Sequence, residues 1–195
     1  MRFLLLFLIL SFYMKGQNNN LPFFEISSEK NEYTSANIIY RLIEGVGYRY
    51  YWASKDLKKK DLDYKPSSSS ISSYQTLEHI YVLSETILNA ALNKVNNRPS
   101  EKMPKSYNEL REETLMNLQK FNDIIISKNE DDLKRIKIIF NRGGREASFP
   151  FWNLLNGQIA DMIYHTGQIV SFRRTTGNPI QKGVNVFLGK TKLSN

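Results

Sequence analysis

Apolar side chains recur every three or four residues in four long stretches of the chain, and this spacing predicts four amphipathic helices. The predicted helices cover residues 34–53, 72–95, 106–125 and 150–176. Loops rich in serine, lysine or proline separate the first three. Four long helices with little predicted strand favour an all-α fold, a four-helix bundle in a single domain.

Polar residues mark the ends of these stretches. Ser72 is followed three residues later by Gln75, and Ser106 by Glu109, which is the capping-box pattern of a helix N-terminus. Gly177 follows the last helix and suits its C′ position. The apolar periodicity and these end signals therefore agree on where the helices begin and end.

Three shorter segments complete the predicted organisation. Residues 131–140 form a short amphipathic element, one or two helical turns or the end of a hairpin, and residues 141–144 form a turn. After Gly177 the tail alternates apolar and polar residues through Val184, Val186 and Phe187. This alternation predicts a short extended C-terminal segment packed on the helices.

The N-terminus carries a separate signal. A short basic start precedes an apolar run of about twelve residues, from Phe3 to Met14, whereas a membrane-spanning helix needs about 20. We expect residues 1–16 to be a signal peptide cleaved near Gly16, although Met14 fits the cleavage pattern poorly, and residues 17–33 to be a flexible lead-in. The protein is then exported, periplasmic or extracellular, with no stable transmembrane anchor. A retained hydrophobic anchor is the alternative.

Composition narrows the chemistry. The 195 residues include no cysteine, which excludes disulfides, thiolate metal ligands and a cysteine nucleophile. The net charge of +8 is spread along the chain and forms no basic stripe interleaved with aromatic residues, so we expect no nucleic-acid partner. We assign Arg173 and Arg174 a structural role.

The fourth predicted helix carries polar residues along a seam that should face its neighbours. The seam consists of Leu154, Gln158, Asp161, His165, Gln168 and Phe172. Asp161 and His165 are four residues apart, so both project from one helical face, as chelating pairs do. The chain's other histidine, His79, lies beside apolar positions of the second helix. His79, Asp161 and His165 are therefore candidate ligands of a divalent cation with open coordination positions. A hydrogen-bonded Asp161–His165 pair without metal is the alternative.

Several motifs resemble those of the DinB/YfiT-like family. They are Asn156-Gly157-Gln158-Ile159-Ala160-Asp161, His165-Thr166-Gly167-Gln168-Ile169, Gly47-Tyr48-Arg49-Tyr50-Tyr51-Trp52 and Thr76-Leu77-Glu78-His79-Ile80. The resemblance implies a DinB-like helical bundle over residues 34–195. Many members bind a divalent metal through three histidines, at positions that match His79, Asp161 and His165 here. Asp161 departs from the all-histidine form and brings the set closer to the facial triad of non-haem iron.

The resemblance implies one divalent ion (Zn, Ni or Fe) and a metal-dependent hydrolase or transferase acting on a small molecule, through activated water or thiol transfer. Two alternatives stay open, namely iron-dependent oxygen chemistry and a non-catalytic binding or stress-related bundle. We name Gln168, Gln158, Tyr50 and Trp52 as residues that support the ligands or line the pocket. A homodimer is left open, since no sequence feature specifies one.

Overall fold

The structure, a computed structural model, describes residues 21–28, 30–100 and 102–192. The predicted signal peptide lies outside these residues. Part of the predicted lead-in is described, and it packs on the first helix, where Phe23 is buried and the backbone carbonyl of Phe24 accepts a hydrogen bond from Trp52 Nε1. Among the described residues, no helix is both long and apolar enough to cross a membrane.

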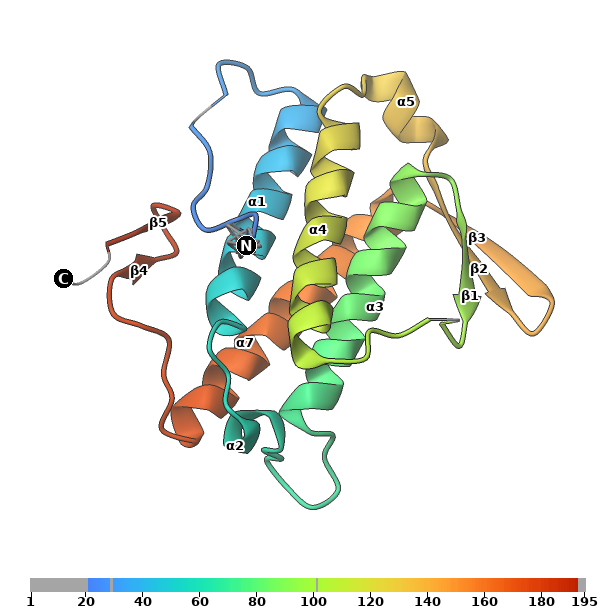
Figure 1. The fold of residues 1–195 in the computed structure, drawn as a ribbon. Helices are drawn as coiled ribbons and strands as arrows, with labels where there is room; N and C mark the ends of the chain where they lie inside the picture. Colours follow the sequence, from blue (N-terminus) through green and yellow to red (C-terminus); the bar gives the residue numbers. More distant parts are fainter. Residues whose placement is uncertain (1–20, 29, 101, 193–195) are drawn as a thin grey trace, which may run out of the picture.

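Four long helices form the body of the molecule, as the periodicity predicts (Figure 1). They are α1 (Ser35–Ala53), α3 (Ser73–Ala91), α4 (Tyr107–Ile125) and α7 (Ala160–Thr175). Helix α3 packs on α4 and α7, and α1 packs on the same two helices. Two short helices, α2 (Lys59–Leu62) and α5 (Glu130–Arg135), lie in the connections.

The predicted N-caps are confirmed. The side chains of Thr34, Ser72 and Ser106 accept hydrogen bonds from the third helical N–H of α1, α3 and α4, so each satisfies a donor that the helix itself cannot. The apolar stripes then meet in one core. Its completely buried members include Ile43, Leu77, Ile80, Ile87, Leu110, Leu115, Leu118, Phe121, Ile125 and Met162.

The fold is largely helical, as expected, but it is not all-α, because the chain also builds a three-stranded sheet beside α3 (Figure 1). Strand β1 (Val95–Arg98) runs parallel to β2 (Lys137–Arg142), and β2 pairs antiparallel with β3 (Arg145–Pro150). Gly143 and Gly144, both with positive φ, turn the chain between β2 and β3. The predicted turn at 141–144 is thus the tip of a hairpin.

Two helix boundaries move because of this sheet. The second helix does not continue to Val95 but ends at Ala91, and Asn96 then fixes the new strand by donating to the backbone carbonyl of Ile139. The fourth helix does not begin at Pro150, which closes β3. Pairing between strands, a contact distant in sequence, overrides the local pattern at both places.

The fourth helical stretch is interrupted near its start. It begins with α6 (Trp152–Leu154), passes through a π-helical turn, η1 (Leu155–Ile159), and becomes regular in α7. A π turn carries one extra residue and resets the phase of the helix, and such turns often lie at functional sites. The predicted seam from Leu154 to Phe172 therefore crosses a change of register just before Asp161.

The C-terminal tail forms a small hairpin, β4 (Val184–Asn185) with β5 (Lys190–Thr191), where we expected one extended segment. Tyr48 of α1 holds it through a hydrogen bond to the backbone carbonyl of Lys190, 2.8 Å away. Ile26 donates its N–H to the carbonyl of Gly189. The tail thus lies against α1 and the N-terminal segment.

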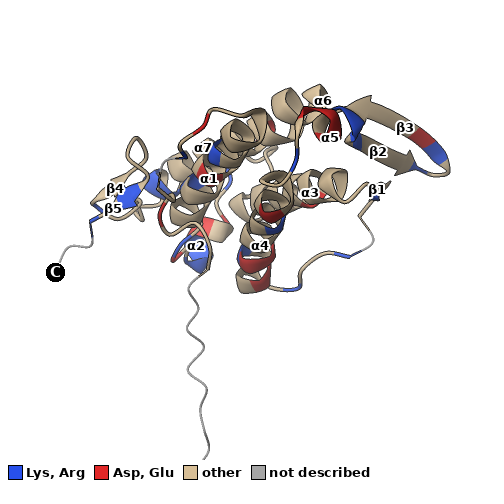
Figure 2. Ribbon diagram, turned by 90° about the horizontal axis from the view of Figure 1, so that it is seen from above, with Lys and Arg blue, Asp and Glu red and all other residues tan. Residues whose placement is uncertain are grey.

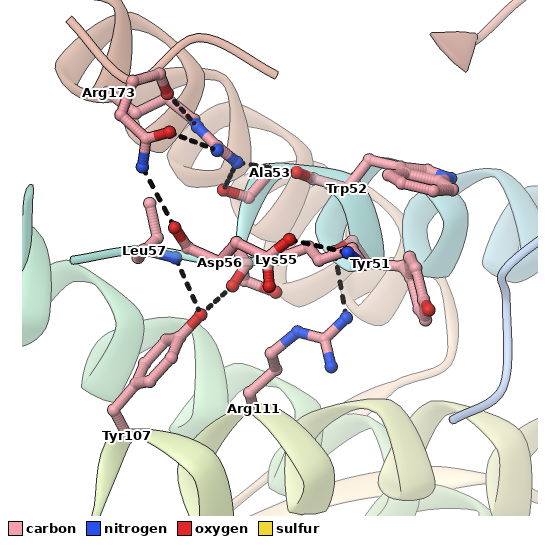
Figure 3. A network of polar contacts seen from close by, with 11 residues as sticks. Tyr51, Trp52, Ala53, Lys55, Asp56, Leu57, Tyr107, Arg111 and Arg173 are labelled. Atoms are coloured by element: carbon pink, nitrogen blue, oxygen red, sulfur yellow. Dashed lines mark hydrogen bonds and ion pairs between the residues drawn. The ribbon is translucent and has the colours of Figure 1, made fainter. Parts of the chain in front are cut away.

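Side chains from other helices complete the C-terminal end of α1 (Figure 3). The buried guanidinium of Arg173, on α7, donates to the carbonyls of Trp52 and Ala53, each 2.9 Å away. Arg111, on α4, donates to the carbonyl of Tyr51. Figure 3 shows the two arginines reaching the end of α1 from different sides. These bonds fix α7, the helix of the candidate ligands, against α1, and they confirm the structural role of Arg173.

Candidate metal centre

The three predicted ligands meet on the surface between α3 and α7. His79 comes from the first half of α3, and Asp161 and His165 come from successive turns of α7. Asp161 Oδ2 lies 3.2 Å from His79 Nε2, and Asp161 Oδ1 lies 3.3 Å from His165 Nε2. One donor atom from each side chain lies within 4.8 Å of the other two.

These distances suit a shared cation. Two ligands bound about 2.1 Å from a tetrahedral ion lie about 3.4 Å apart. The two nitrogen–oxygen separations are close to this value, each to a different oxygen of Asp161, and the His79 contact also has the length of a hydrogen bond. The two imidazole rings stand edge to face at 87° with their centroids 4.6 Å apart, so Asp161 sits between two converging nitrogens. Two imidazoles and one carboxylate match the donors preferred by first-row divalent metals.

Gln168 orients one of the ligands. Its Oε1 lies 2.7 Å from Nδ1 of His165, one turn back along α7. Because an amide oxygen only accepts, Nδ1 donates this hydrogen bond, and Nε2 is the nitrogen that faces Asp161. A proton or a shared cation between Nε2 and the carboxylate accounts for their contact. Gln168 therefore contacts His165, the candidate ligand that it is predicted to support.

The centre lies nearer to solvent than we expected. His79 was predicted to face inward, but its side chain is 44% exposed and that of Asp161 is 42% exposed, whereas His165 is 17% exposed. The residues of α7 that point into the core are Met162 and Ile169, and both are buried. The three ligands thus converge as predicted, but at the rim of the helical body and not inside it.

A shallow hollow of about 380 Å³ opens beside Asp161. Its wall combines the π-helical turn with α3 and α7 and is formed by Leu83, Asn156, Gly157, Gln158, Ala160, Asp161 and Tyr164. Gln158 is one of the predicted pocket residues, and its Oε1 is buried without a hydrogen-bond partner in the described part of the chain. An unpaired buried acceptor of this kind costs about 1–3 kcal/mol.

Sequence reasoning did not identify Tyr164. Its ring is 65% exposed and lies 5.2 Å from that of His165, at the edge of the hollow. No periodicity could select it, because it follows neither the apolar stripe nor the polar seam of the helix. The one feature of the sequence that could have indicated Tyr164 is its position directly before His165, a candidate ligand.

Tyr50 and Trp52 do not line this site, which corrects our prediction. Both are core residues of α1, 1% and 2% exposed. The carbonyl of Trp52 meets Arg173, eight residues beyond His165 and hence about 12 Å further along α7. Burial strongly raises the pKa of Tyr50, so its hydroxyl stays neutral. Aromatic packing accounts for both residues.

Comparison with known proteins agrees with this architecture. The profile of the DinB family matches residues 32–182. The crystal structure of a DinB-like protein, YjoA from Bacillus subtilis, is similar to the chain with a TM-score of 0.53 at 19% sequence identity, and the match covers 72% of this chain and 92% of that one. At this identity the likeness concerns the fold alone. None of the curated proteins matches the sequence.

Proposed function

Because the chain belongs to the DinB family, we propose that it binds one divalent metal ion through His79, Asp161 and His165 and converts a small molecule there. The observation that carries the proposal is the convergence of the chain's two histidines, 86 positions apart, on one carboxylate. We also propose that α1, α3, α4 and α7 correspond to the four-helix bundle of this family.

The residues divide the work at such a centre. When bound, the ion supplies Lewis acidity, which polarises a substrate oxygen or thiol or activates a water molecule. Asp161 contributes the single negative charge of the ligand set and keeps both histidines in place. Gln168 holds the proton of His165 on Nδ1, so that Nε2 stays available as a ligand.

The hollow beside Asp161 receives the substrate in this proposal. Leu83 and Tyr164 supply apolar contact, and the wall residues Asn156 and Gln158 carry polar amide side chains. The wall contains no lysine or arginine, so it favours a neutral polar molecule over an anionic one. Hydrolysis and group transfer are the reaction classes that such a site supports.

Elemental analysis of the purified protein tests the metal proposal. We expect about one ion per chain, and we expect His165→Ala to remove it, since two ligands rarely hold a divalent ion against dialysis. Glu78→Gln is the matched control. It removes a carboxylate one residue from His79 that lies outside the cluster, and it should leave the metal content unchanged. A His165→Ala protein that keeps its ion would overturn the proposal.

Two other functions predict different results for the metal content of the purified protein. Iron-dependent oxygen chemistry is favoured by the carboxylate at Asp161, and it requires iron to occupy the site when iron and zinc are both supplied. A non-catalytic binding protein requires that the purified chain take up none of Zn²⁺, Ni²⁺ and Fe²⁺ and show no rise in melting temperature when they are added.

Export remains part of the proposal. The apolar run before Lys15 is the feature that supports it, and N-terminal sequencing of the mature protein tests it. A mature chain that still begins at Met1 would contradict cleavage.

The oligomeric state is a separate question, because a homodimer was left open. Size-exclusion chromatography with light scattering separates a monomer from a homodimer.

A further inference from the structure

Three arginines lie side by side across the three-stranded sheet. Arg98 of β1 is in register with Arg142 of β2, and Arg142 is in register with Arg145 of β3. Residues in register on neighbouring strands place their side chains on the same face, about 5 Å apart at the backbone. We call Arg98, Arg142 and Arg145 the arginine row. Figure 2 shows basic residues at the outer end of the β2–β3 hairpin, away from the four long helices.

An aromatic ring organises two members of the row. The guanidinium of Arg98 lies 5.5 Å from the ring centroid of Phe140, and that of Arg142 lies 5.9 Å from it. Arg98 also donates to Thr86 of α3 and to the backbone carbonyl of Asn97. Arg98 is therefore anchored to α3, and both Arg98 and Arg142 lie near the ring of Phe140. Arg142 and Arg145 are exposed at the sheet surface.

The row concentrates charge of one sign. Burial lowers the pKa of Arg98, the nearby Glu85 raises it, and the positive charge of Arg142 lowers it further. Glu85, which accepts a hydrogen bond from Ser100, offsets one of the three charges and leaves about two uncompensated. Like charges directly opposite one another on a sheet destabilise it, so folding alone does not favour this arrangement.

The hairpin turn fixes the backbone that carries Arg142 and Arg145. Gly143 and Gly144 have φ values of 60° and 83°, which suits a two-residue turn that only residues tolerant of positive φ adopt. The side chain of Asn141 accepts a hydrogen bond from the N–H of Gly144 and stiffens the tip. The backbone positions of Arg142 and Arg145, which flank this turn, are therefore set before any ligand arrives.

We propose that the arginine row binds a small molecule carrying two oxyanion groups, such as phosphates, sulfates or carboxylates, about 5 Å apart. Guanidinium groups pair with such groups through two parallel hydrogen bonds, and the strand spacing sets the distance between them. The site shares no residue with the proposed metal centre. It contributes a second recognition surface, specific for anions, to a molecule whose metal-side hollow has no basic wall.

Binding of 1,3-benzenedisulfonate to the purified full-length protein tests this proposal. Its two sulfonates stand at about the required spacing, and sulfonates coordinate divalent metals weakly, so the metal centre does not interfere. Isothermal titration at constant ionic strength should give at least tenfold tighter binding of the disulfonate than of benzenesulfonate, since only the former engages two arginines.

The double variant Arg142→Gln with Arg145→Gln should weaken disulfonate binding by about tenfold or more. Both positions are exposed, so the fold should persist, and circular dichroism checks this. Lys137→Gln is the matched control, because Lys137 is an exposed cation on the opposite face of β2, one residue from the buried Ile138. No measurable binding, equal binding of both sulfonates, or equal losses in the control and the double variant would each overturn the proposal.

Discussion

Side chains of two other helices, α4 and α7, satisfy the last carbonyls of α1, a task that helices usually leave to water or to a C-cap. Arg173, a residue that is 4% exposed, donates to the carbonyls of Trp52 and Ala53 at the end of α1 and also to the carbonyl of Asn178, just beyond its own helix. The sequence placed Arg173 in the last turn of a helix but could not reveal which carbonyls it would meet, because those lie on another helix. The structural role of Arg173 was predicted correctly, but the carbonyl groups that it contacts were not.

Replacing Arg173 by methionine keeps most of its aliphatic volume and removes every donor. The carbonyls of Trp52 and Ala53 would then be buried without partners, and we expect the free energy of unfolding to fall by about 3 kcal/mol. Urea denaturation measures this. Arg174→Met, one residue along and exposed, should change stability by less than about 0.5 kcal/mol. Equal losses in the two variants would show that the capping bonds contribute little.

Gln168 offers a finer test of the metal centre than any ligand does. Gln168→Ala leaves His79, Asp161 and His165 in place but removes the acceptor that fixes the proton of His165 on Nδ1. We expect metal affinity to fall by about 10-fold to 100-fold, measured by competition with a chromogenic chelator. Ser171→Ala, at an exposed position of the same helix, is the control. Unchanged affinity in Gln168→Ala would mean that the hydrogen bond does not orient the ligand.

Among the elements, the long helices with their own periodicity were predictable, whereas the sequence marked only two parts of the sheet, the turn at 141–144 and, as one alternative, the end of a hairpin within 131–140. Helices α3 and α4 begin at the polar residues that marked them, since the caps and the stripes are local signals. Strand β3 escaped prediction because all of its residues are exposed and no apolar alternation marks it. Its partner β2 has one fully buried residue, Ile138, so the pattern there was equally weak.

The π-helical turn η1 was invisible for a related reason. Leu154 and Asp161 are seven residues apart, a spacing that a regular helix also places on one face, so nothing in the sequence required an extra residue between them. The pair of candidate ligands was predictable because Asp161 and His165 both lie beyond the interruption, within regular α7.

Packing of the N-terminal segment on α1 depends on a glycine. A Cβ at Gly47 would overlap the ring of Phe23, which is buried there. Gly47→Ala should therefore lower the free energy of unfolding by about 1–3 kcal/mol, although alanine is the better helix former. Gly167→Ala is the control, because open space surrounds that position of α7, and it should stabilise the protein by about 0.5–1 kcal/mol. Thermal unfolding distinguishes the two, and stabilisation by both would show that Phe23 moves aside at no cost.

For the molecule as a whole, the sequence predicted the helical body and the three candidate ligands but not their depth. Apolar neighbours of His79 suggested an inward direction, yet Ile80 and Leu83 are buried while His79 faces solvent. One residue corresponds to about 100° of rotation on a helix, so a ligand beside two core positions can still point outward. How deeply a side chain is buried depends on how the helices pack against one another. The periodicity of the sequence shows only which face of a helix is apolar.

Acid stability of the whole molecule should depend on Asp61, a buried carboxyl between α2 and the end of α7. Burial alone would raise its pKa, but hydrogen bonds from Thr176, the N–H of Lys58 and Asn178 outweigh burial and hold the pKa below its ordinary value. The folded state thus takes up this proton less readily than the unfolded state does. Its stabilising contribution is complete above about pH 4 and is lost as the pH falls through the folded-state pKa.

Asp61→Asn should accordingly be less stable than the wild type at pH 6, and the difference should shrink at pH 3. Guanidinium denaturation at the two pH values measures it. Asp63→Asn, which removes an exposed carboxylate from the same region, should show little difference at either pH. A gap between wild type and Asp61→Asn that does not change with pH would contradict the assignment.

The rim position of His79 and Asp161 bears on how an ion would enter and leave. With two of the three ligands more than two-fifths open to water, no helix has to separate and no core contact has to break for exchange to proceed. Loading kinetics would then follow the ligand-substitution rate of the hydrated ion, fast for zinc and slow for nickel, and not the opening rate of the protein. A folded chain could therefore acquire its metal after synthesis, from whatever ions its surroundings supply.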